Sequence, residues 1–400
     1  MAEAKSSGPD NGEPIHVMHV VRRGFAGGGM ENGIVNVANR LSAERYRVSV
    51  CALDSSETFS QRIRRSDSEF HLLPKYGEGI DWGLVWRLAL LLRRTKPHLL
   101  HSHNWGTFLY AVLAARLARV PVIHGEHGKN FGELGPESRP KQWSKSILGP
   151  RLNRLVTVSK VLADEWAGYG VPPDKIQHIP NGVDTERFRP RLDTAECRHK
   201  FGLPEDGILV GSVGRMDEFK NYGVLISAFA SIASEFPDMH VALLGDGPDE
   251  RSLRAKTQEL GVERRVFFLG RHLDSENFLA ALDIFALPSK TEGMSNVLLE
   301  AMASGLPVVC DDLPCHREVF QADREGLVVS PCIAGTLAGR LAELYRNPPL
   351  RRVLGAAARE KVLSCFRIAR MVSDYDRLYI NCWQERVEGR SAWQGSATRI

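Results

Sequence analysis

The sequence lacks a long hydrophobic run. Its apolar runs, such as the one around Leu88–Leu92, are far shorter than the roughly 20 residues that a membrane-spanning helix needs. The first fourteen residues are polar and rich in Gly and Pro, so they also lack the apolar segment of a secretory signal. These absences predict a soluble, cytoplasmic protein that at most rests on the inner surface of a membrane.

Cysteine and net charge are also scarce. Seven cysteines scattered along the 400 residues are an odd number, which argues against a disulfide framework and favours a reducing compartment. The 52 basic and 48 acidic side chains leave a net charge of only +4, too small for a typical nucleic-acid-binding protein. We therefore expect no nucleic-acid partner, although a local positive cleft for a phosphorylated substrate is compatible with this balance.

Strand-like and helix-like segments alternate in two separate series. Such alternation predicts parallel sheets covered by helices, and the length suits two domains of similar size. The first series has predicted strands at Ile15–Val21, Arg47–Leu53, Glu69–Leu73, His98–His103, Pro121–His124 and Leu155–Val158. The second has predicted strands at Ile208–Val213, His240–Leu244, Val266–Leu269, Ile284–Leu287, Pro307–Cys310 and Gly326–Val329. The clearest helical patterns cover Met30–Leu41, Asn221–Ser234, Glu250–Leu260 and Val297–Ala303.

The expected fold class is therefore α/β, with two Rossmann-like, doubly wound domains facing each other across a cleft. A polar, Pro-punctuated stretch around residues 185–204 suggests the linker. The predicted organisation is a disordered tail (1–14), an N-terminal domain (15–190), a C-terminal domain (191–367), a helix packing back on the N-terminal domain (368–388) and a disordered tail (389–400).

A glycine run, Gly27-Gly28-Gly29, lies between the first predicted strand and the first predicted helix. Backbone N–H groups and a helix N-terminus can approach a phosphate closely at such a place. The spacing is not that of the G-x-G-x-x-G dinucleotide fingerprint. A flexible loop without a ligand is the alternative.

A second candidate site follows the strand Ile208–Val213 and contains Arg215 and Lys220. Ligands of open α/β sheets bind beyond the carboxyl ends of the strands, and two cations there suit a diphosphate leaving group. The alternative is a solvated basic loop.

A third candidate site runs from Glu292 to Glu300. The first glutamate precedes a predicted helix and the second lies inside it, roughly 10 Å further along the axis. That separation fits two ends of one extended ligand better than a catalytic carboxylate pair. The alternative is a helix N-terminal charge at Glu292 and a surface side chain at Glu300. A buried strand follows soon after Glu300, however, and an unpaired charge so close to a buried strand would be energetically costly.

These three sites, in this order, resemble the retaining glycosyltransferases of the GT-B fold, the fourth family of the usual classification. Between Gly211 and Val309 the matching motifs are GSVGRMDEFKN, LLGDGPDE and TEGMSNVLLEAMASGLPVV, and Asn181-Gly182-Val183-Asp184 matches a further motif. The N-terminal motifs GGGMENGIVNVANRL and HGEHG look like those of bacterial sugar transferases found with exopolysaccharide assembly systems.

The resemblance implies a role for each matching residue. Arg215 and Lys220 would hold the donor diphosphate. Glu292 would contact the hydroxyls of the transferred sugar, and Glu300 would bind the nucleotide ribose. The other implied contacts are with His127, close to the donor sugar, and with Gly28, Gly29, Gly293, Met294, Ser295 and Asn296. No metal ion and no cofactor are implied, because protein cations and helix dipoles would do that work.

The expected reaction moves a hexose or N-acetylhexosamine from a nucleotide diphosphate sugar to a hydroxyl of a sugar or lipid-linked glycan acceptor, with retention. The N-terminal domain would bind the acceptor and the C-terminal domain the donor. Front-face attack is favoured, because no carboxylate is evidently dedicated to a covalent intermediate. One alternative is a non-hydrolysing nucleotide-sugar epimerase. Another is an inactive sugar-nucleotide-binding scaffold, which should have lost some of the four charged site residues, yet all four are present.

Two further groups are expected to be structural. His101 and His103 alternate with Leu100 and Ser102 on a predicted strand, so satisfied core histidines are the simpler interpretation, and one of them lining the cleft is the alternative. Cys310, Cys315 and His316 match no standard zinc spacing.

One segment suggests a membrane contact. Residues Lys129–Arg154 contain six basic and two acidic side chains together with Phe131 and Trp143. This segment either lies against an anionic membrane that carries the acceptor or forms a solvated acceptor loop.

Overall fold

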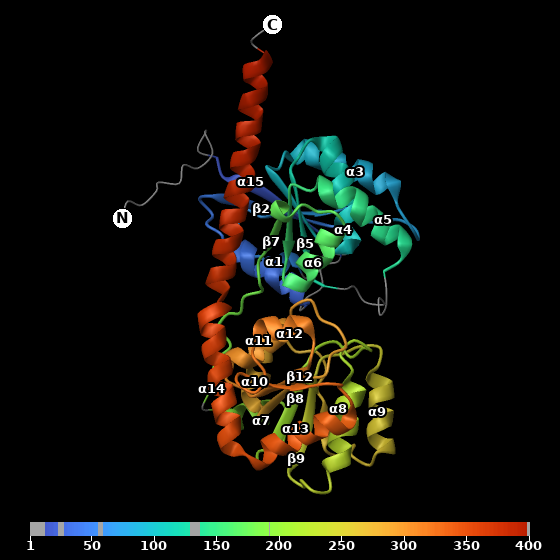
Figure 1. Ribbon diagram of the computed structural model, residues 1–400, viewed down its shortest axis with the longest axis vertical. Helices are drawn as coiled ribbons and strands as arrows, with labels where there is room; N and C mark the ends of the chain where they lie inside the picture. The colour runs from blue at the N-terminus through green and yellow to red at the C-terminus, as the bar shows by residue number, and fades with distance from the viewer. Residues whose placement is uncertain (1–12, 23–27, 55–58, 129–136, 192, 398–400) are drawn as a thin grey trace, which may run out of the picture. The chain divides into compact units, whose positions relative to one another are not determined.

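The computed structural model describes residues 13–22, 28–54, 59–128, 137–191 and 193–397 (Figure 1). The chain divides into two compact units, unit 1 from Met1–Pro180 with Met371–Ile400, and unit 2 from Asn181–Arg370. The sequence placed this divide at residue 190 instead. Residues 181–190 belong to unit 2 because Val183 pairs with Arg367, and the Phe188 carbonyl accepts a hydrogen bond from Arg359.

Unit 1 is built on a seven-stranded parallel sheet in the order β3-β2-β1-β4-β5-β6-β7. Its strands are β1 (Ile15–Val21), β2 (Tyr46–Ala52), β3 (Glu69–Leu72), β4 (Leu99–His103), β5 (Val122–Glu126), β6 (Arg154–Thr157) and β7 (Ile176–His178). β1, β4 and β5 are buried along their whole length, as strands covered on both faces should be. The order reverses between β1 and β4, which is where ligands of doubly wound sheets bind.

Helices cover both faces of this sheet. They are α1 (Gly29–Arg40), α2 (Phe59–Arg62), α3 (Trp82–Thr95), α4 (Trp105–Ala118), α5 (Arg139–Leu148) and α6 (Lys160–Gly168), with 3₁₀ turns at Gly149–Arg151 and Pro173–Lys175. α3 packs along α4, and both bury aliphatic and aromatic side chains in the main core of the unit. The apolar spacing of α3, with Leu84, Leu88 and Leu92 on one face, accounts for that packing.

Unit 2 repeats the architecture with six parallel strands in the order β10-β9-β8-β11-β12-β13. The strands are β8 (Ile208–Val213), β9 (Met239–Leu244), β10 (Val266–Phe268), β11 (Ile284–Leu287), β12 (Val308–Asp311) and β13 (Leu327–Val329). Its helices are α7 (Thr194–Lys200), α8 (Tyr222–Ile232), α9 (Glu250–Glu259), α10 (Ser275–Ala281), α11 (Asn296–Ala303), α12 (Pro314–Val319), α13 (Ala334–Arg346) and α14 (Pro348–Cys365). The two doubly wound domains predicted from the sequence are confirmed, and the reversal of order here lies between β8 and β11.

The last helix, α15 (Ile368–Ala397), returns the chain to unit 1. Asp376 accepts hydrogen bonds from the Tyr46 hydroxyl at 2.7 Å and from Arg45 at 3.0 Å. The Tyr379 hydroxyl is hydrogen-bonded to His101 Nδ1 at 2.8 Å. The helix therefore packs on the N-terminal sheet as the sequence predicted. It continues to Ala397, past the point where a disordered tail was expected, whereas most of the predicted N-terminal tail lies outside the described residues.

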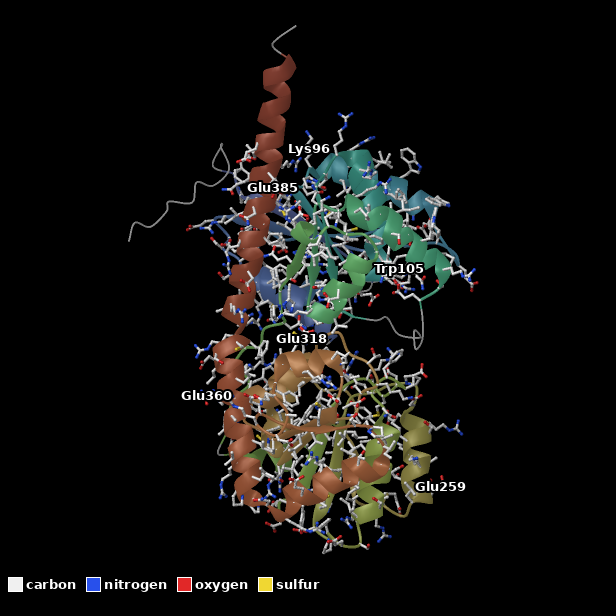
Figure 2. All side chains as sticks on the ribbon, in the orientation of Figure 1. Lys96, Trp105, Glu259, Glu318, Glu360 and Glu385 are labelled. Carbon is white, nitrogen blue, oxygen red and sulfur yellow. The ribbon has the colours of Figure 1, made fainter. Side chains whose placement is uncertain are left out.

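A search of the described helices finds none that is long and apolar enough to cross a bilayer. Side chains fill the interior of each unit, and Figure 2 shows Lys96 on the outer surface of unit 1, just after α3.

Candidate functional site

The loops after β8 and β11 meet at the reversal point of unit 2. Lys220, in the first loop, donates a hydrogen bond from Nζ to Glu292 Oε1 in the second loop, at 2.6 Å. Ser289 Oγ donates to the same carboxylate oxygen at 2.8 Å. The structure thus brings together two of the predicted site residues and adds Ser289, which the sequence did not single out.

The Glu292 carboxylate is held in its ionised form. Burial acts to raise its pKa, but the positive charge and hydrogen bond of Lys220, with smaller help from His316 and Ser289, lower it below its usual value. Lys220 and Glu292 are both largely buried, so the pair is little screened by water.

Arg215 lies next to this pair on the same loop, with its side chain half exposed. Its Nε is 3.6 Å from Asp217 Oδ2, while Asp217 Oδ1 accepts hydrogen bonds from the backbone N–H groups of Phe219 and Lys220. Asp217 therefore ties the loop into a fixed turn, and the Arg215 guanidinium extends from it toward solvent.

The loop before α11 is held by the N-G-V-D motif. Asn181 donates a hydrogen bond from Nδ2 to the Met294 carbonyl at 3.1 Å. Ser295 then forms the N-cap of α11, and its buried Oγ has no hydrogen-bond partner among the described residues. The segment Gly293–Asn296 thus sits at a helix N-terminus, where the backbone favours a negatively charged ligand.

Glu300, further along α11, is in a different electrostatic environment. Burial raises its pKa to about 7, and nearby Glu276 adds to the rise, whereas Arg187 acts against it. No described residue donates a hydrogen bond to its carboxylate. Unit 2 therefore holds two carboxylates whose pKa values are pushed apart, one ionised and one poised near neutrality.

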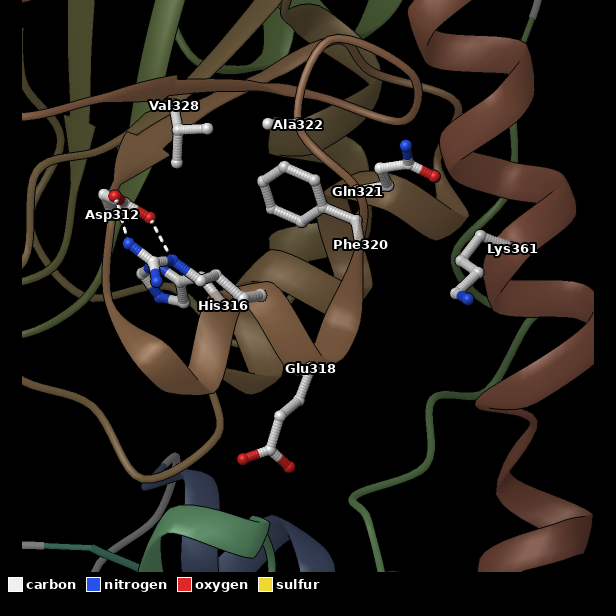
Figure 3. A pocket seen from close by; sticks show the side chains of 9 residues that line it. Asp312, His316, Glu318, Phe320, Gln321, Ala322, Val328 and Lys361 are labelled. Carbon is white, nitrogen blue, oxygen red and sulfur yellow. Dashed lines mark hydrogen bonds and ion pairs between the residues drawn. The ribbon is translucent and has the colours of Figure 1, made fainter.

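A cavity of about 500 Å³ lies beside α12 (Figure 3). His316 Nδ1 donates to the Asp311 carbonyl at 2.8 Å, which leaves a buried Nε2 without a hydrogen-bond partner among the described residues. Burial lowers the pKa of His316. The residues that line this cavity are Asp312, His316, Arg317, Glu318, Phe320, Gln321, Ala322, Val328 and Lys361.

In unit 1, Gly28 is the N-cap of α1 and Gly29 is its first residue, while Gly27 lies outside the described residues. A Cβ on Gly28 would meet Glu31 Oε2 at 2.0 Å, so the Glu31 carboxylate lies directly over this position. Burial raises the pKa of Glu31. The helix N-terminus predicted to face a phosphate thus already carries an acidic side chain that the sequence did not reveal.

A hydrogen-bonded row of histidines leads from β1 to His127. His19 Nδ1 lies 2.9 Å from His103 Nε2, and His103 Nδ1 lies 3.0 Å from His127 Nε2. Burial lowers the pKa of His19 and His127 to about 4, and that of His103 well below its usual value. All three imidazoles are therefore neutral near neutral pH, and each has one N–H and one lone pair.

Only two proton arrangements satisfy both hydrogen bonds. The final N–H belongs either to His19 Nε2 or to His127 Nδ1. His19 Nε2 is buried without a hydrogen-bond partner among the described residues, and a buried unpaired N–H costs about 1–3 kcal/mol. The second arrangement is therefore favoured, and His127 presents its Nδ1–H as a hydrogen-bond donor.

The ring nitrogens of His19, His101 and His103 also lie within 4.8 Å of one another. Within the described parts of the chain, this is the one group with metal-ligand spacing, so Cys310, Cys315 and His316 form no such group there. Because these histidines are hydrogen-bonded to one another and to Tyr379, we interpret them as structural residues.

Comparison with known proteins identifies the family. The profile described as Glycosyltransferase Family 4 matches residues 27–187, and that described as Glycosyl transferases group 1 matches residues 193–361. The GDP-mannose-dependent monoacylated alpha-(1-6)-phosphatidylinositol monomannoside mannosyltransferase of Corynebacterium glutamicum is 32% identical over 267 residues, which are 64% of this chain and 68% of that relative. This chain belongs to glycosyltransferase family 4.

Other similarities agree with this assignment. The UDP-Gal:alpha-D-GlcNAc-diphosphoundecaprenol alpha-1,3-galactosyltransferase of Escherichia coli is 28% identical over 305 residues, 74% of this chain and 78% of that relative. The crystal structure of Anabaena Alr3699/HepE in complex with UDP-glucose superposes with a TM-score of 0.80 at 19% identity, over 91% of this chain and 99% of that one. At this identity the likeness is one of fold, and it confirms the GT-B class. The predicted enzyme class, a glycosyltransferase, is therefore confirmed.

Within this family-4 enzyme, the predicted site residues fall into two groups, one on each unit. Unit 2 joins Lys220 to Glu292 and places the other predicted residues on the same two loops and on α11. Unit 1 carries Gly28, Gly29 and His127 at the carboxyl ends of its strands. The site residues that the sequence did not single out are Ser289, Glu31 and His19, whereas His103 was singled out and interpreted as a structural histidine. The place of His19 on a strand and of Glu31 in a helical first turn could have pointed to these two residues, whereas no sequence signal marks Ser289.

The segment suggested to contact a membrane, Lys129–Arg154, is described from Glu137 onward. Residues 129–136 lie outside the described residues, and Lys141 and Lys145 are buried and paired with Glu137. Arg154 pairs with Glu385. Three of the segment's six basic side chains are therefore paired with acidic groups of unit 1, whereas Arg139 and Arg151 are exposed.

Proposed function

We propose that this glycosyltransferase transfers a hexose or N-acetylhexosamine from a nucleotide diphosphate sugar to an acceptor hydroxyl, with retention of the anomeric configuration. The donor would bind to unit 2 and the acceptor to unit 1. The Escherichia coli relative is named for a UDP-sugar and a diphosphoundecaprenol-linked acceptor. That name supports a nucleotide-sugar donor and a sugar or lipid-linked glycan acceptor, used in polysaccharide or glycolipid synthesis.

The observation that carries this proposal is the ion pair of Lys220 with Glu292 at the reversal point of the unit 2 sheet. An incoming diphosphate would attract the Lys220 ammonium, and the released Glu292 carboxylate would accept hydrogen bonds from sugar hydroxyls. Arg215 and the N-terminus of α11 would add positive potential at the same place. Charge stabilisation of this kind requires no metal ion and no cofactor.

Retention is best explained by attack on the face from which the diphosphate leaves. The bond between the anomeric carbon and the phosphate oxygen breaks while the bond to the acceptor oxygen forms. The acceptor proton passes to an oxygen of the departing diphosphate. The Glu292 carboxylate would keep its hydrogen bond from Ser289 and accept further hydrogen bonds from the sugar hydroxyls, so it would bind the sugar and not act as a nucleophile. The Nδ1–H of His127 would donate a hydrogen bond to the donor sugar.

The test is a thermal-shift screen of UDP-, GDP- and ADP-sugars on the wild type, Lys220→Ala and Glu292→Ala. A ligand that binds only the native state raises the melting temperature. One donor should stabilise the wild type, and both variants should lose that response. Arg264→Ala is a suitable control, because this exposed residue lies at the amino end of β10, whereas the ion pair lies beyond the carboxyl ends of β8 and β11. A Lys220→Ala or Glu292→Ala variant that is stabilised like the wild type would show that the ion pair is not part of the donor site.

Two further measurements address the stereochemistry and the metal. The anomeric configuration of the product, read by NMR, should match that of the donor. Activity should survive a chelator, because Lys220 and Arg215 supply the positive charge. An inverted product or a loss of activity restored by a divalent cation would contradict the mechanism.

A further inference from the structure

An unusual surface lies on α3 of unit 1 and on the loop before it. Thirteen large hydrophobic side chains are exposed in the described chain, and six of them fall between residues 72 and 90. Trp82, Trp86 and Leu90 are 61%, 58% and 60% exposed. They are spaced four residues apart, so they form one continuous stripe along the outer face of the helix.

The loop before the helix extends this apolar surface. Tyr76 and Ile80 are 65% and 54% exposed. The Arg87 guanidinium of α3 lies 4.7 Å from the centre of the Tyr76 ring, which places Tyr76 against the helix. Asp81 caps the helix by accepting from the Leu84 N–H, and it also pairs with Arg87. These contacts hold the loop against the helix, so the exposed apolar side chains of both form one ordered surface.

Positive charge borders the stripe. The chain from Trp82 to Gly125 contains six basic residues and no acidic one. Five of the six are exposed at the carboxyl ends of α3 and α4, and Arg93 donates a hydrogen bond to the Leu117 carbonyl, which holds these two helix ends together. These five residues are Arg93, Arg94, Lys96, Arg116 and Arg119. The nearest exposed acidic side chain in the sequence is Glu78, in the loop.

We propose that this face, made of Tyr76, Ile80, Trp82, Trp86 and Leu90 with its basic border, docks on an anionic lipid bilayer. Tryptophan favours the boundary between headgroups and hydrocarbon, because its ring has an apolar body and a polar N–H. Arginine and lysine side chains beside it reach anionic headgroups. An aromatic stripe flanked by positive charge, with no acidic residue on the helix, matches a lipid surface better than a charged protein partner.

This inference moves the membrane contact from the Lys129–Arg154 segment to α3. The benefit of docking, access to a lipid-linked acceptor, rests on the proposed function. The docking itself needs no donor and no catalysis, so it is measured without nucleotide sugar. Its failure is therefore distinguishable from a failure of the proposed function.

The experiment is co-sedimentation of the full chain with vesicles of phosphatidylcholine alone or mixed with an equal amount of phosphatidylglycerol. The wild type should bind the anionic vesicles at low salt and bind the neutral ones weakly. Trp82→Ser/Trp86→Ser should reduce the partition coefficient on the order of tenfold or more. Arg94→Gln/Lys96→Gln should reduce anionic binding by about fivefold per residue and flatten its salt dependence.

Trp143→Ser is the matched control, because Trp143 is 68% exposed but lies on α5. It should bind vesicles like the wild type, and all variants should keep the wild-type melting temperature because these side chains are solvent-exposed. Absence of anionic binding by the wild type, or an equal loss in Trp143→Ser, would overturn the proposal. Self-association that is lost in Trp82→Ser/Trp86→Ser, without vesicle binding, would also overturn it and make this face a protein interface.

Discussion

At the scale of single residues, the ion pair between Lys220 and Glu292 should make the stability of the protein depend on pH. Lys220→Met should lower the free energy of unfolding by about 3 kcal/mol near pH 8, because it leaves a buried carboxylate unpaired. The lowered pKa of Glu292 means that its contribution is present above the unfolded-state pKa and is lost as the pH falls through the folded-state value. The deficit of the variant should therefore shrink toward about pH 4. Urea denaturation at both pH values measures it.

The double variant Lys220→Met/Glu292→Gln is the control for this effect. It removes the orphaned charge, so it should recover most of the stability lost at high pH. An equal loss of unfolding free energy at both pH values in Lys220→Met would show that the ion pair does not make stability depend on pH.

Glu300 should make donor affinity depend on pH. Its raised pKa of about 7 means that a large fraction of the carboxyl groups is protonated in the free enzyme at neutral pH. Ribose hydroxyls that donate to the ionised form would lower that pKa, so binding should release a proton and tighten as the pH rises through about 7. Calorimetry of nucleotide-sugar binding in buffers with different ionisation enthalpies measures the proton release. Glu300→Gln should bind more weakly and release no proton.

The histidine row makes a prediction about a single hydrogen atom. His127 should be the Nδ1–H tautomer, because the alternative places an unpaired N–H at the buried Nε2 of His19. Heteronuclear NMR of the imidazole nitrogens distinguishes the two forms. In His103→Phe the row is broken, and His127 should shift toward the Nε2–H form that predominates in solution. Finding that form already in the wild type would contradict the favoured arrangement.

At the scale of elements, the loop that carries Arg215 depends on a glycine in the next loop. Gly245 has a φ of +141°, and a Cβ there would come within 2.0 Å of the Gly214 carbonyl oxygen. Gly245→Ala should destabilise unit 2 by about 2–3 kcal/mol and weaken donor binding, because the Arg215 loop must shift. Thermal unfolding with and without the donor measures both effects.

Gly261 provides the matched control for this substitution. It also has a positive φ, of +68°, but a Cβ would meet nothing within 4 Å. Gly261→Ala should cost about 1 kcal/mol and leave donor affinity unchanged. Equal effects of the two substitutions would mean that backbone strain, and not the collision with the loop, is responsible.

Most strands were predictable because fully buried parallel strands leave continuous apolar runs in the sequence. β1, β8 and β11 were predicted with their observed bounds, and the ends of the other predicted strands deviate by one or two residues. β7 was missed because Ile176–His178 is a three-residue edge strand with polar side chains and no apolar run. Strand β5 ends at Glu126, two residues later than predicted, because a glycine and a buried carboxylate complete it.

The unit 2 part of the candidate site could be predicted because its residues are grouped in short motifs. Lys220 and Glu292 belong to motifs that each follow a strand. Contacts made between distant segments were not visible, such as Asn181 with Met294 or His19 with His103. The α3 surface was missed because an exposed apolar residue cannot be told from a buried one before the helix is placed on its sheet.

At the scale of the whole molecule, unit 1 is assembled from both ends of the chain. Asp376 on α15 accepts hydrogen bonds from Tyr46 and Arg45 on the N-terminal part. Asp376→Ala should lower the stability of unit 1 by about 1 kcal/mol, because the Tyr46 hydroxyl keeps only its longer hydrogen bond to the backbone carbonyl of residue 376, at 3.1 Å, and Arg45 loses its ion pair. Hydrogen exchange of β2 amides, which report on unit 1 alone, measures this. Asp374→Ala is the control, since Asp374 pairs with Arg377 on the same helix. Unchanged exchange in Asp376→Ala would mean that α15 adds little to this sheet.

The return of the last helix also sets the order in which a ribosome completes the protein. The strands of unit 1 are synthesised before unit 2, but Asp376 and Tyr379 leave the ribosome only after all of unit 2. A chain that stops within unit 2 has a first sheet with no cover over Tyr46 and His101. The apolar surface left open on such a fragment marks it for chaperones and proteases. Cells that make this enzyme should therefore accumulate whole molecules and no stable N-terminal halves.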